Sequence, residues 1–151
     1  ELLKSLYVVN CHYLMLDFFI NCKNIRLLKL EFNRLVDNPR NDTTLRYNLS
    51  RSPLEKLLVS LTALEALHLD SFFVELLSAH VVPDGLPFTL NCLRCLLLNV
   101  EGRISCALQL IKNSPNLSEL KILVYSSRNN AEAVLKYLDT PSCLERPLGK
   151  L

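Results

Sequence analysis

The segment ISCALQLIKNSPNLSELKILV, which begins at Ile104, changes from one hydrophobic period to another. Its first half places apolar residues at i, i+3, i+4 and i+7, which is the single stripe of an amphipathic helix. Pro115 has no backbone N–H and disfavours helical angles in the residue before it, so this helix is predicted to end near Asn113. Leu120 and Ile122 then alternate with charged residues, which predicts a short strand with one buried face.

The same strand spacing, L-x-x-L-x-L with an apolar residue at each marked position, recurs along the chain. The five units begin at Leu3, Ile25, Leu64, Leu93 and Leu117, so their starts are 22, 39, 29 and 24 residues apart. Three of these separations lie in the range of roughly 20–29 residues that is typical of leucine-rich repeats. In the first two units, Cys11 and Asn33 stand where such repeats carry a Cys or Asn that bonds the backbone of the turn.

These units predict one sheet of parallel strands, because each strand is followed by a connection that returns across the stack. A sixth, weaker strand is predicted at Leu14, Leu16 and Phe18. The five main strands are predicted at residues 6–8, 28–30, 67–69, 96–98 and 120–122.

Helical patterns lie between the strands. A capping residue, Ser52, with Pro53 at the first helical position opens one apolar stripe, and residues 72–79 and 131–138 show similar stripes. Polar residues 36–53 are predicted to be an insertion loop that accounts for the long second step. Because stacked strand–helix units bury each other's apolar faces, we predict an α/β leucine-rich-repeat solenoid, with a curved parallel sheet and with helices and loops on the convex side.

Length and composition fit one domain, residues 1–151, with a continuous repeat core. The chain is 50% hydrophobic, and its net charge of +2 comes from basic residues scattered among acidic ones. This distribution provides no basic stripe for nucleic acid. The sequence contains no run of about 18 apolar residues, so it predicts no membrane-spanning helix. The sequence begins at Glu1 inside a repeat, so we expect it to be a fragment of a longer protein.

Six cysteines would be enough for disulfides, but their positions inside predicted strands and helices favour buried, reduced thiols. We therefore expect the protein in the cytoplasm or nucleus. Three glycosylation triplets, which begin at Asn41, Asn48 and Asn116, do not overturn this expectation, because such triplets also arise by chance. Cys92 and Cys95 form a C-x-x-C pair, but residues three apart on a strand point to opposite faces, so we expect no metal there.

The C-terminal part of the chain resembles a known family. The segments LNCLRCLLLNVEGRISCALQLIKNSPNLSELKILV, from Leu90, and AEAVLKYLDTPSCLERPLGKL, from Ala131, are similar to the leucine-rich-repeat and FBD region of plant F-box/FBD/LRR-repeat proteins. The pattern ISCALxLIxxSPNLxxLxI is distinctive of that family. The similarity covers most of the chain and is strongest over residues 90–151, the FBD-like part.

The resemblance implies the substrate-recognition part of an SCF-type E3 ubiquitin ligase, in which an N-terminal F-box holds the ligase and the repeats hold a target protein. The F-box is missing from this sequence, so contact with the ligase adaptor would depend on a segment upstream of Glu1. The sequence also stops at RPLGKL, where the family continues into at least one more strand. A structural or scaffold repeat without a ligase role is the alternative.

An enzyme is the weakest interpretation. His68, Asp70 and Ser71 are the residue types of a hydrolase triad, but Ser71 points away from the strand face that the other two share, and no nucleophile turn is evident. The 3 glycines provide no phosphate-cradling loop. We expect neither catalytic residues nor a cofactor.

Leucine-rich repeats bind partners through the outward positions of their strands, so the candidate site is one face of the sheet. Here these positions mix apolar and charged groups, as transient protein interfaces do. Leucines exposed in a row favour binding over the alternative of a merely solvated face. The predicted protein-binding residues are Tyr7, Leu27, Lys29, Glu31, His68, Asp70, Cys95, Leu97, Asn99, Glu119, Lys121 and Leu123.

Overall fold

The computed structural model describes residues 3–9, 16–32, 51–78, 86–101 and 104–124, together with Lys136. Within these residues the chain forms an α/β arrangement of five strands, three α-helices and one 3-10 helix. The strands are β1 (Ser5–Val9), β2 (Leu27–Glu31), β3 (Ala66–Leu69), β4 (Cys95–Val100) and β5 (Glu119–Val124).

All neighbouring strands are parallel, and their order in the sheet follows the sequence, β1-β2-β3-β4-β5. Each predicted strand lies inside an observed one, so the prediction of five parallel strands in one sheet is confirmed. The register follows the repeated spacing, because the second apolar residues of the five units stand side by side across the sheet. These residues are Leu6, Leu28, Leu67, Leu96 and Leu120.

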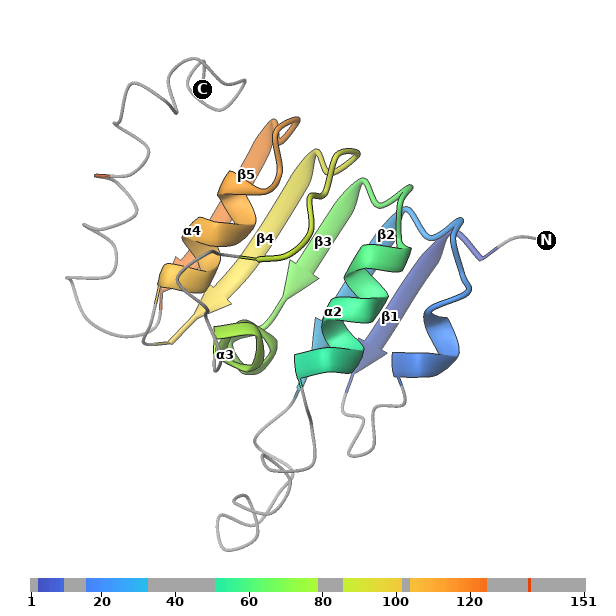
Figure 1. Ribbon diagram of the computed structural model, residues 1–151. Helices are drawn as coiled ribbons and strands as arrows, with labels where there is room; N and C mark the ends of the chain where they lie inside the picture. The colour runs from blue at the N-terminus through green and yellow to red at the C-terminus, as the bar shows by residue number, and fades with distance from the viewer. Residues whose placement is uncertain are drawn as a thin grey trace, which may run out of the picture.

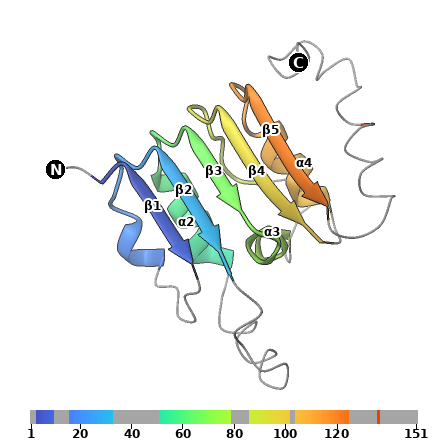
Figure 2. The same cartoon turned by 180° about the vertical axis from the view of Figure 1, so that it is seen from behind.

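The helices lie on one side of the sheet (Figure 1). They are η1 (Leu16–Phe19), α2 (Arg51–Ser60), α3 (Ser71–Ser78) and α4 (Ser105–Lys112). From behind, the strands lie in front of α2 and α4, and no described element covers that side (Figure 2). The helices α3 and α4 confirm those predicted at residues 72–79 and after Ile104. Since α2 already begins at Arg51, Ser52 lies inside the helix and is not its cap.

Alternation along the strands sends one set of apolar side chains toward the helices. These strand residues are 0–7% exposed: Val8, Leu28, Leu30, Leu67, Leu69, Leu96 and Leu98. They meet fully buried helix residues such as Leu57 of α2, Leu77 of α3 and Leu110 of α4. Because the inward residues of neighbouring strands stand side by side, the core is one continuous layer between the sheet and the helices.

Hydrogen bonds at the start of each strand repeat from unit to unit. The carbonyl oxygen of Lys4 accepts the N–H groups of two successive residues, Arg26 and Leu27, at N···O distances of 2.7 and 3.2 Å. The carbonyls of Arg26, Glu65 and Arg94, which stand just before β2, β3 and β4, accept two successive N–H groups at the start of β3, β4 and β5 in the same way. The connections differ in length, yet each returns the chain to the same point beside the previous strand.

The weak strand predicted at Leu14, Leu16 and Phe18 is wrong in the part that the structure describes, where Leu16–Phe19 forms η1. Strand alternation would bury Leu16 and Phe18 together, but Leu16 is 1% exposed and Phe18 is 70% exposed. The three-residue period of a 3-10 helix instead places Leu16 and Phe19 on the same side. Phe19 accordingly packs against the core.

Other predictions lie wholly or partly outside the described residues. These are the helix at 131–138 apart from Lys136, residues 36–50 of the insertion, and the turn positions Cys11 and Asn33. Residues 51–53 belong to α2, so any insertion loop ends before Arg51. Among the described residues, no helix is long and apolar enough to cross a membrane.

Candidate protein-binding face

No described element covers the side of the sheet opposite the helices, and we call this side the open face (Figure 2). It carries the outward side chains of all five strands. The strand register arranges these side chains in three rows that cross the sheet. The first row is Ser5, Leu27, Ala66, Cys95 and Glu119, the middle row is Tyr7, Lys29, His68, Leu97 and Lys121, and the third row is Val9, Glu31, Asn99 and Leu123. Every predicted binding residue except Asp70 lies on this face.

Lys29, Glu31 and His68 form a charged cluster near the middle of the open face. Lys29 and Glu31 are two residues apart on β2, and Lys29 Nζ lies 2.9 Å from Glu31 Oε1. His68, which stands opposite Lys29 on β3, places its Nε2 atom 3.7 Å from the same oxygen. All three side chains are half-buried, so the ion pair is screened by water less than one on an open surface.

The environment of His68 favours its neutral form. Burial lowers the pKa of this imidazole below its ordinary value of 6.5, because the charged form loses hydration. The carboxylate of Glu31 opposes this shift, and the ammonium group of Lys29 adds to it. The middle row therefore presents a neutral imidazole between Lys29 and Leu97 near neutral pH.

Two polar atoms near the centre of the open face have no hydrogen-bond partner among the described residues. They are His68 Nε2 and Asn99 Oδ1, and both are buried. Leu97 stands opposite His68 and two residues before Asn99, so the two atoms flank it. An unsatisfied buried polar atom costs about 1–3 kcal/mol. A bound partner that supplied hydrogen bonds here would recover part of that free energy.

Apolar side chains gather at the two ends of the open face. At the β1 end, Tyr7 is 59% exposed and Val9 is 48% exposed. At the β5 end, Leu123 is 36% exposed and lies beside the exposed Lys121 in the neighbouring row. The face thus has a half-buried charged centre with apolar groups on both sides, which offers both orientation and apolar area to a partner.

Cys95 and Glu119 are neighbours in the first row. Burial raises the pKa of the Cys95 thiol, and the charge and hydrogen bond of the Glu119 carboxylate raise it further. This thiol is therefore held in its protonated, less nucleophilic form.

The prediction that Asp70 belongs to the strand face is wrong. β3 ends at Leu69, and Asp70 turns into the molecule, where it is 9% exposed. Its Oδ1 atom accepts the N–H of Phe73 at 3.1 Å, which caps the first turn of α3, and its Oδ2 atom accepts the N–H of Phe32. The carboxylate therefore joins the end of β2 to the start of α3, and the strand alternation stops one residue before the predicted position.

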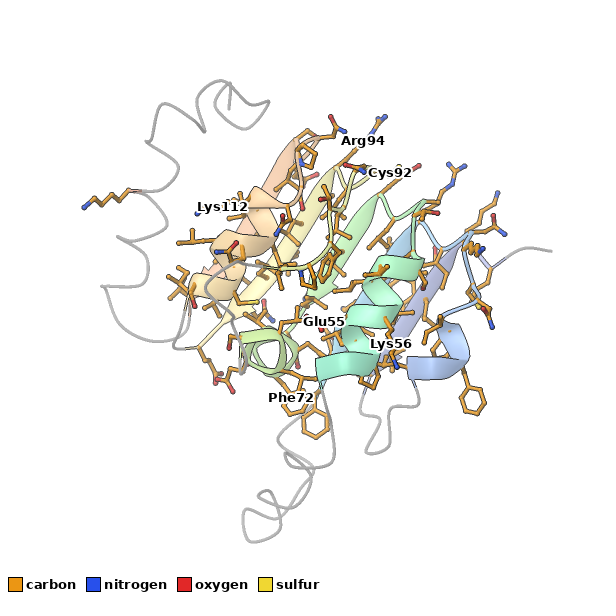
Figure 3. All side chains as sticks on the ribbon, viewed as in Figure 1. Glu55, Lys56, Phe72, Cys92, Arg94 and Lys112 are labelled. Atoms are coloured by element: carbon orange, nitrogen blue, oxygen red, sulfur yellow. The ribbon has the colours of Figure 1, made fainter. Side chains whose placement is uncertain are left out.

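The structure does not bring together the residues that the sequence suggested for a hydrolase triad or a metal site. Asp70 is engaged by backbone amides, and His68 instead has Glu31 as its nearby carboxylate. Cys92 is exposed in the turn before β4, at the end of the sheet where the strands begin (Figure 3), whereas Cys95 is half-buried on the open face. The described residues contain no group of three or more His, Cys, Asp or Glu side chains suited to a metal ion.

Sequence reasoning missed the capping role of Asp70, although the signal was present. Asp is among the preferred residues immediately before a helix, and Asp70 directly precedes the apolar stripe of α3. The unsatisfied atoms of His68 and Asn99 leave no comparable trace in the sequence, because they depend on side-chain conformations in neighbouring strands. Comparisons with family models, curated proteins and solved structures gave no match.

Proposed function

We propose that this chain is a leucine-rich-repeat solenoid whose open face binds a target protein, as the substrate-recognition part of an SCF-type E3 ubiquitin ligase F-box protein. One observation carries the binding proposal: no described element covers the outward side chains of five parallel strands. All-parallel sheets are normally covered on both faces. A parallel sheet with one open face therefore has a surface suited to a partner.

The solenoid part of the proposal is supported by the hydrogen bonds between units. The same doubly accepting carbonyl recurs at Lys4, Arg26, Glu65 and Arg94, so each described unit sits on the preceding one in the same way. Sequential strand order with one unit contacting the next is the arrangement that stacked repeats produce.

The composition of the open face indicates the chemistry of the target. The middle row contains two lysines, Lys29 and Lys121, and no acidic residue. The acidic residues Glu31 and Glu119 stand in the outer rows. We expect a target segment that lies across the strands, with acidic groups near the two lysines and apolar side chains near the ends of the face.

The ligase role rests on the family resemblance of residues 90–151, and it requires an F-box upstream of Glu1. The described cysteines Cys22, Cys92, Cys95 and Cys106 form no disulfide with one another, which supports a place in the cytoplasm or nucleus, where such ligases act. A scaffold repeat without a ligase role would use the same face, so the two functions have to be separated by experiment.

Charge reversal on the open face tests binding. Full-length receptor carrying Lys29→Glu or Lys121→Glu should capture its target about tenfold less well, because each change places an acid where we expect the target to be acidic. The matched control is Lys56→Glu, which reverses an exposed lysine of α2 on the helical side (Figure 3). Unaltered circular dichroism should show that all three variants fold. Unchanged capture by both face variants would move binding to the loops or the helical side.

The ligase role has a separate test. If the proposal holds, the captured target is ubiquitylated by the full-length receptor, and deletion of the upstream F-box abolishes ubiquitylation but leaves capture intact. Capture without any ubiquitylation would favour the scaffold function.

A further inference from the structure

Exposed apolar side chains concentrate at the two outermost strands. Among the described residues, the large apolar side chains that are most exposed are Leu3, Tyr7, Val9, Phe18, Val59 and Leu123. Three of them lie in or just before β1, and Leu123 lies in β5. Leu3 is the clearest case, because it is 47% exposed while the residues at the same repeat position, Ile25 and Leu117, are at most 1% exposed.

The outer edge of β1 is also unpaired in the part of the chain that the structure describes. Since Leu27 donates to the Lys4 carbonyl, the parallel ladder directs the N–H and C=O groups of Ser5, Tyr7 and Val9 away from β2. These groups are a template for one more strand.

Among the described residues, the outer edge of β5 has unpaired backbone groups that could hydrogen-bond to those of β1. Glu119 donates to the carbonyl of Arg94, so the carbonyl of Ser118 and the backbone groups of Leu120 and Ile122 face away from β4. Ser118 occupies the position held in earlier units by Lys4, whose carbonyl accepts the amides of the next strand. No described strand pairs with this edge.

We propose that two copies of this chain associate head to tail, with β5 of one copy pairing in parallel with β1 of the next. The register is that of the existing sheet continued by one strand, so Glu119, Lys121 and Leu123 would meet Ser5, Tyr7 and Val9 of the next copy. The Ser118 carbonyl would accept the N–H of Ser5.

The side chains that meet in this register are compatible in each layer. On the helical side, half-buried Leu120 would meet half-buried Leu6, which completes apolar burial at both ends of the core. In the middle row, Lys121 would stand beside Tyr7, the same pairing that Lys29 already makes with Tyr7 inside the sheet. A lysine next to a tyrosine ring is a favourable neighbour.

In the third row the contact joins two exposed apolar residues, Val9 and Leu123. An antiparallel β1–β1 dimer would instead leave Leu123 and the β5 edge open. Because the two edges of the proposed contact are different surfaces, it propagates into open filaments or closes into rings.

Two substitutions test this contact, and neither alters the core. Val9→Lys damages the β1 edge and Leu123→Lys damages the β5 edge, because each brings a charge against an apolar residue. Lys56→Glu on α2 is the control. Sedimentation velocity of the unmodified 17.2 kDa chain should show association that grows with concentration, and each edge variant should weaken it about tenfold or more. The Lys56→Glu chain should behave like the unmodified chain.

Mixing the two edge variants gives the sharper result. The intact β5 edge of the Val9→Lys chain fits the intact β1 edge of the Leu123→Lys chain, while the two damaged edges place lysines against each other. The mixture should therefore form heterodimers and stop there. A monodisperse monomer of the unmodified chain would refute the proposal. Full association of both edge variants, each measured by itself, would also refute it. So would normal association of the Leu123→Lys chain together with loss of association in the Val9→Lys chain, because a β1–β1 dimer would give that result.

Discussion

Removal of the Asp70 carboxylate is expected to destabilise the fold rather than to remove a binding contact. The side chain is 9% exposed, and its two oxygens accept the N–H groups of Phe32 and Phe73. In Asp70→Ala both amides lose these acceptors, one at the end of β2 and one in the first turn of α3. The helix loses its cap and the strand loses its link to the helix.

The expected cost follows from these two bonds. Loss of a helix cap costs about 0.5–2 kcal/mol, and loss of the half-buried hydrogen bond from Phe32 to a charged carboxylate costs about 1.5–3 kcal/mol. Asp70→Ala should therefore lower the free energy of unfolding by about 2–4 kcal/mol, a large share of the roughly 5–15 kcal/mol typical of a domain. In a chain of this size the melting temperature should fall by about 5–15 °C. Asp70→Asn, which keeps one acceptor oxygen, should lose about half as much.

Urea unfolding followed by circular dichroism measures this loss. The matched control is Glu65→Ala, which removes a half-exposed acid whose Oε1 atom lies 3.3 Å from Arg26 Nη1. A surface ion pair of this kind contributes about 0–1 kcal/mol, so Glu65→Ala should be nearly neutral. The slope of the unfolding free energy against urea concentration (the m-value) should stay unchanged in both variants. An Asp70→Ala loss no greater than that of Glu65→Ala would refute the assigned capping role.

Two titrating groups of the open face give further predictions. Burial lowers the pKa of His68 in the folded chain, so the unfolded chain binds this proton more readily. The stability that comes from the neutral imidazole is therefore present above pH 6.5, and it is lost as the pH falls through the lowered pKa of the folded chain. Between about pH 7.5 and about pH 5.5, the urea midpoint should therefore fall more for the unmodified chain than for His68→Gln, and equal falls would contradict this reasoning. Because burial and Glu119 raise the pKa of Cys95, Glu119→Gln should speed alkylation of Cys95 near about pH 8, measured by peptide mass spectrometry. An unchanged rate would show that Glu119 does not control the thiol.

The strands could be predicted because two independent signals in the sequence agree. Alternation selects the buried face of each strand, and the repeated L-x-x-L-x-L spacing fixes the register, as Leu28, Leu67 and Leu96 show by standing side by side. A strand of four to six residues also leaves little room for error, since a shift by one residue would expose the leucines that are buried against the helices.

The errors arose where a second local pattern competed with alternation. At Asp70, capping of the next helix prevails over the outward strand position, because a carboxylate beside unsatisfied helix amides is stabilised there. At Leu16–Phe19, a three-residue period prevails over a two-residue period that the same apolar residues also satisfy. In a segment this short the sequence cannot distinguish the periods, and packing of Leu16 and Phe19 against the core decides.

The charged cluster required information that a linear pattern does not contain. Alternation predicts that Lys29, Glu31 and His68 share a face, but the approach of His68 to Glu31 depends on which strands are neighbours and on side-chain conformation. The connection between β2 and β3 is the longest of the four, so local sequence gives no measure of that distance.

Target binding and self-association are compatible in this geometry, because head-to-tail pairing would lengthen the open face without covering it. Lys121 takes part in both, since it belongs to the middle row and would stand beside Tyr7 of the next copy. Lys29 lies on β2, between two strands of the same chain, and takes no part in the edge contact. Lys29→Glu should therefore reduce target capture at unchanged association, whereas Val9→Lys should reduce association first. If Lys29→Glu altered both measurements equally, the face and the edge would not be separate surfaces, and the target would have to bind across the junction between copies.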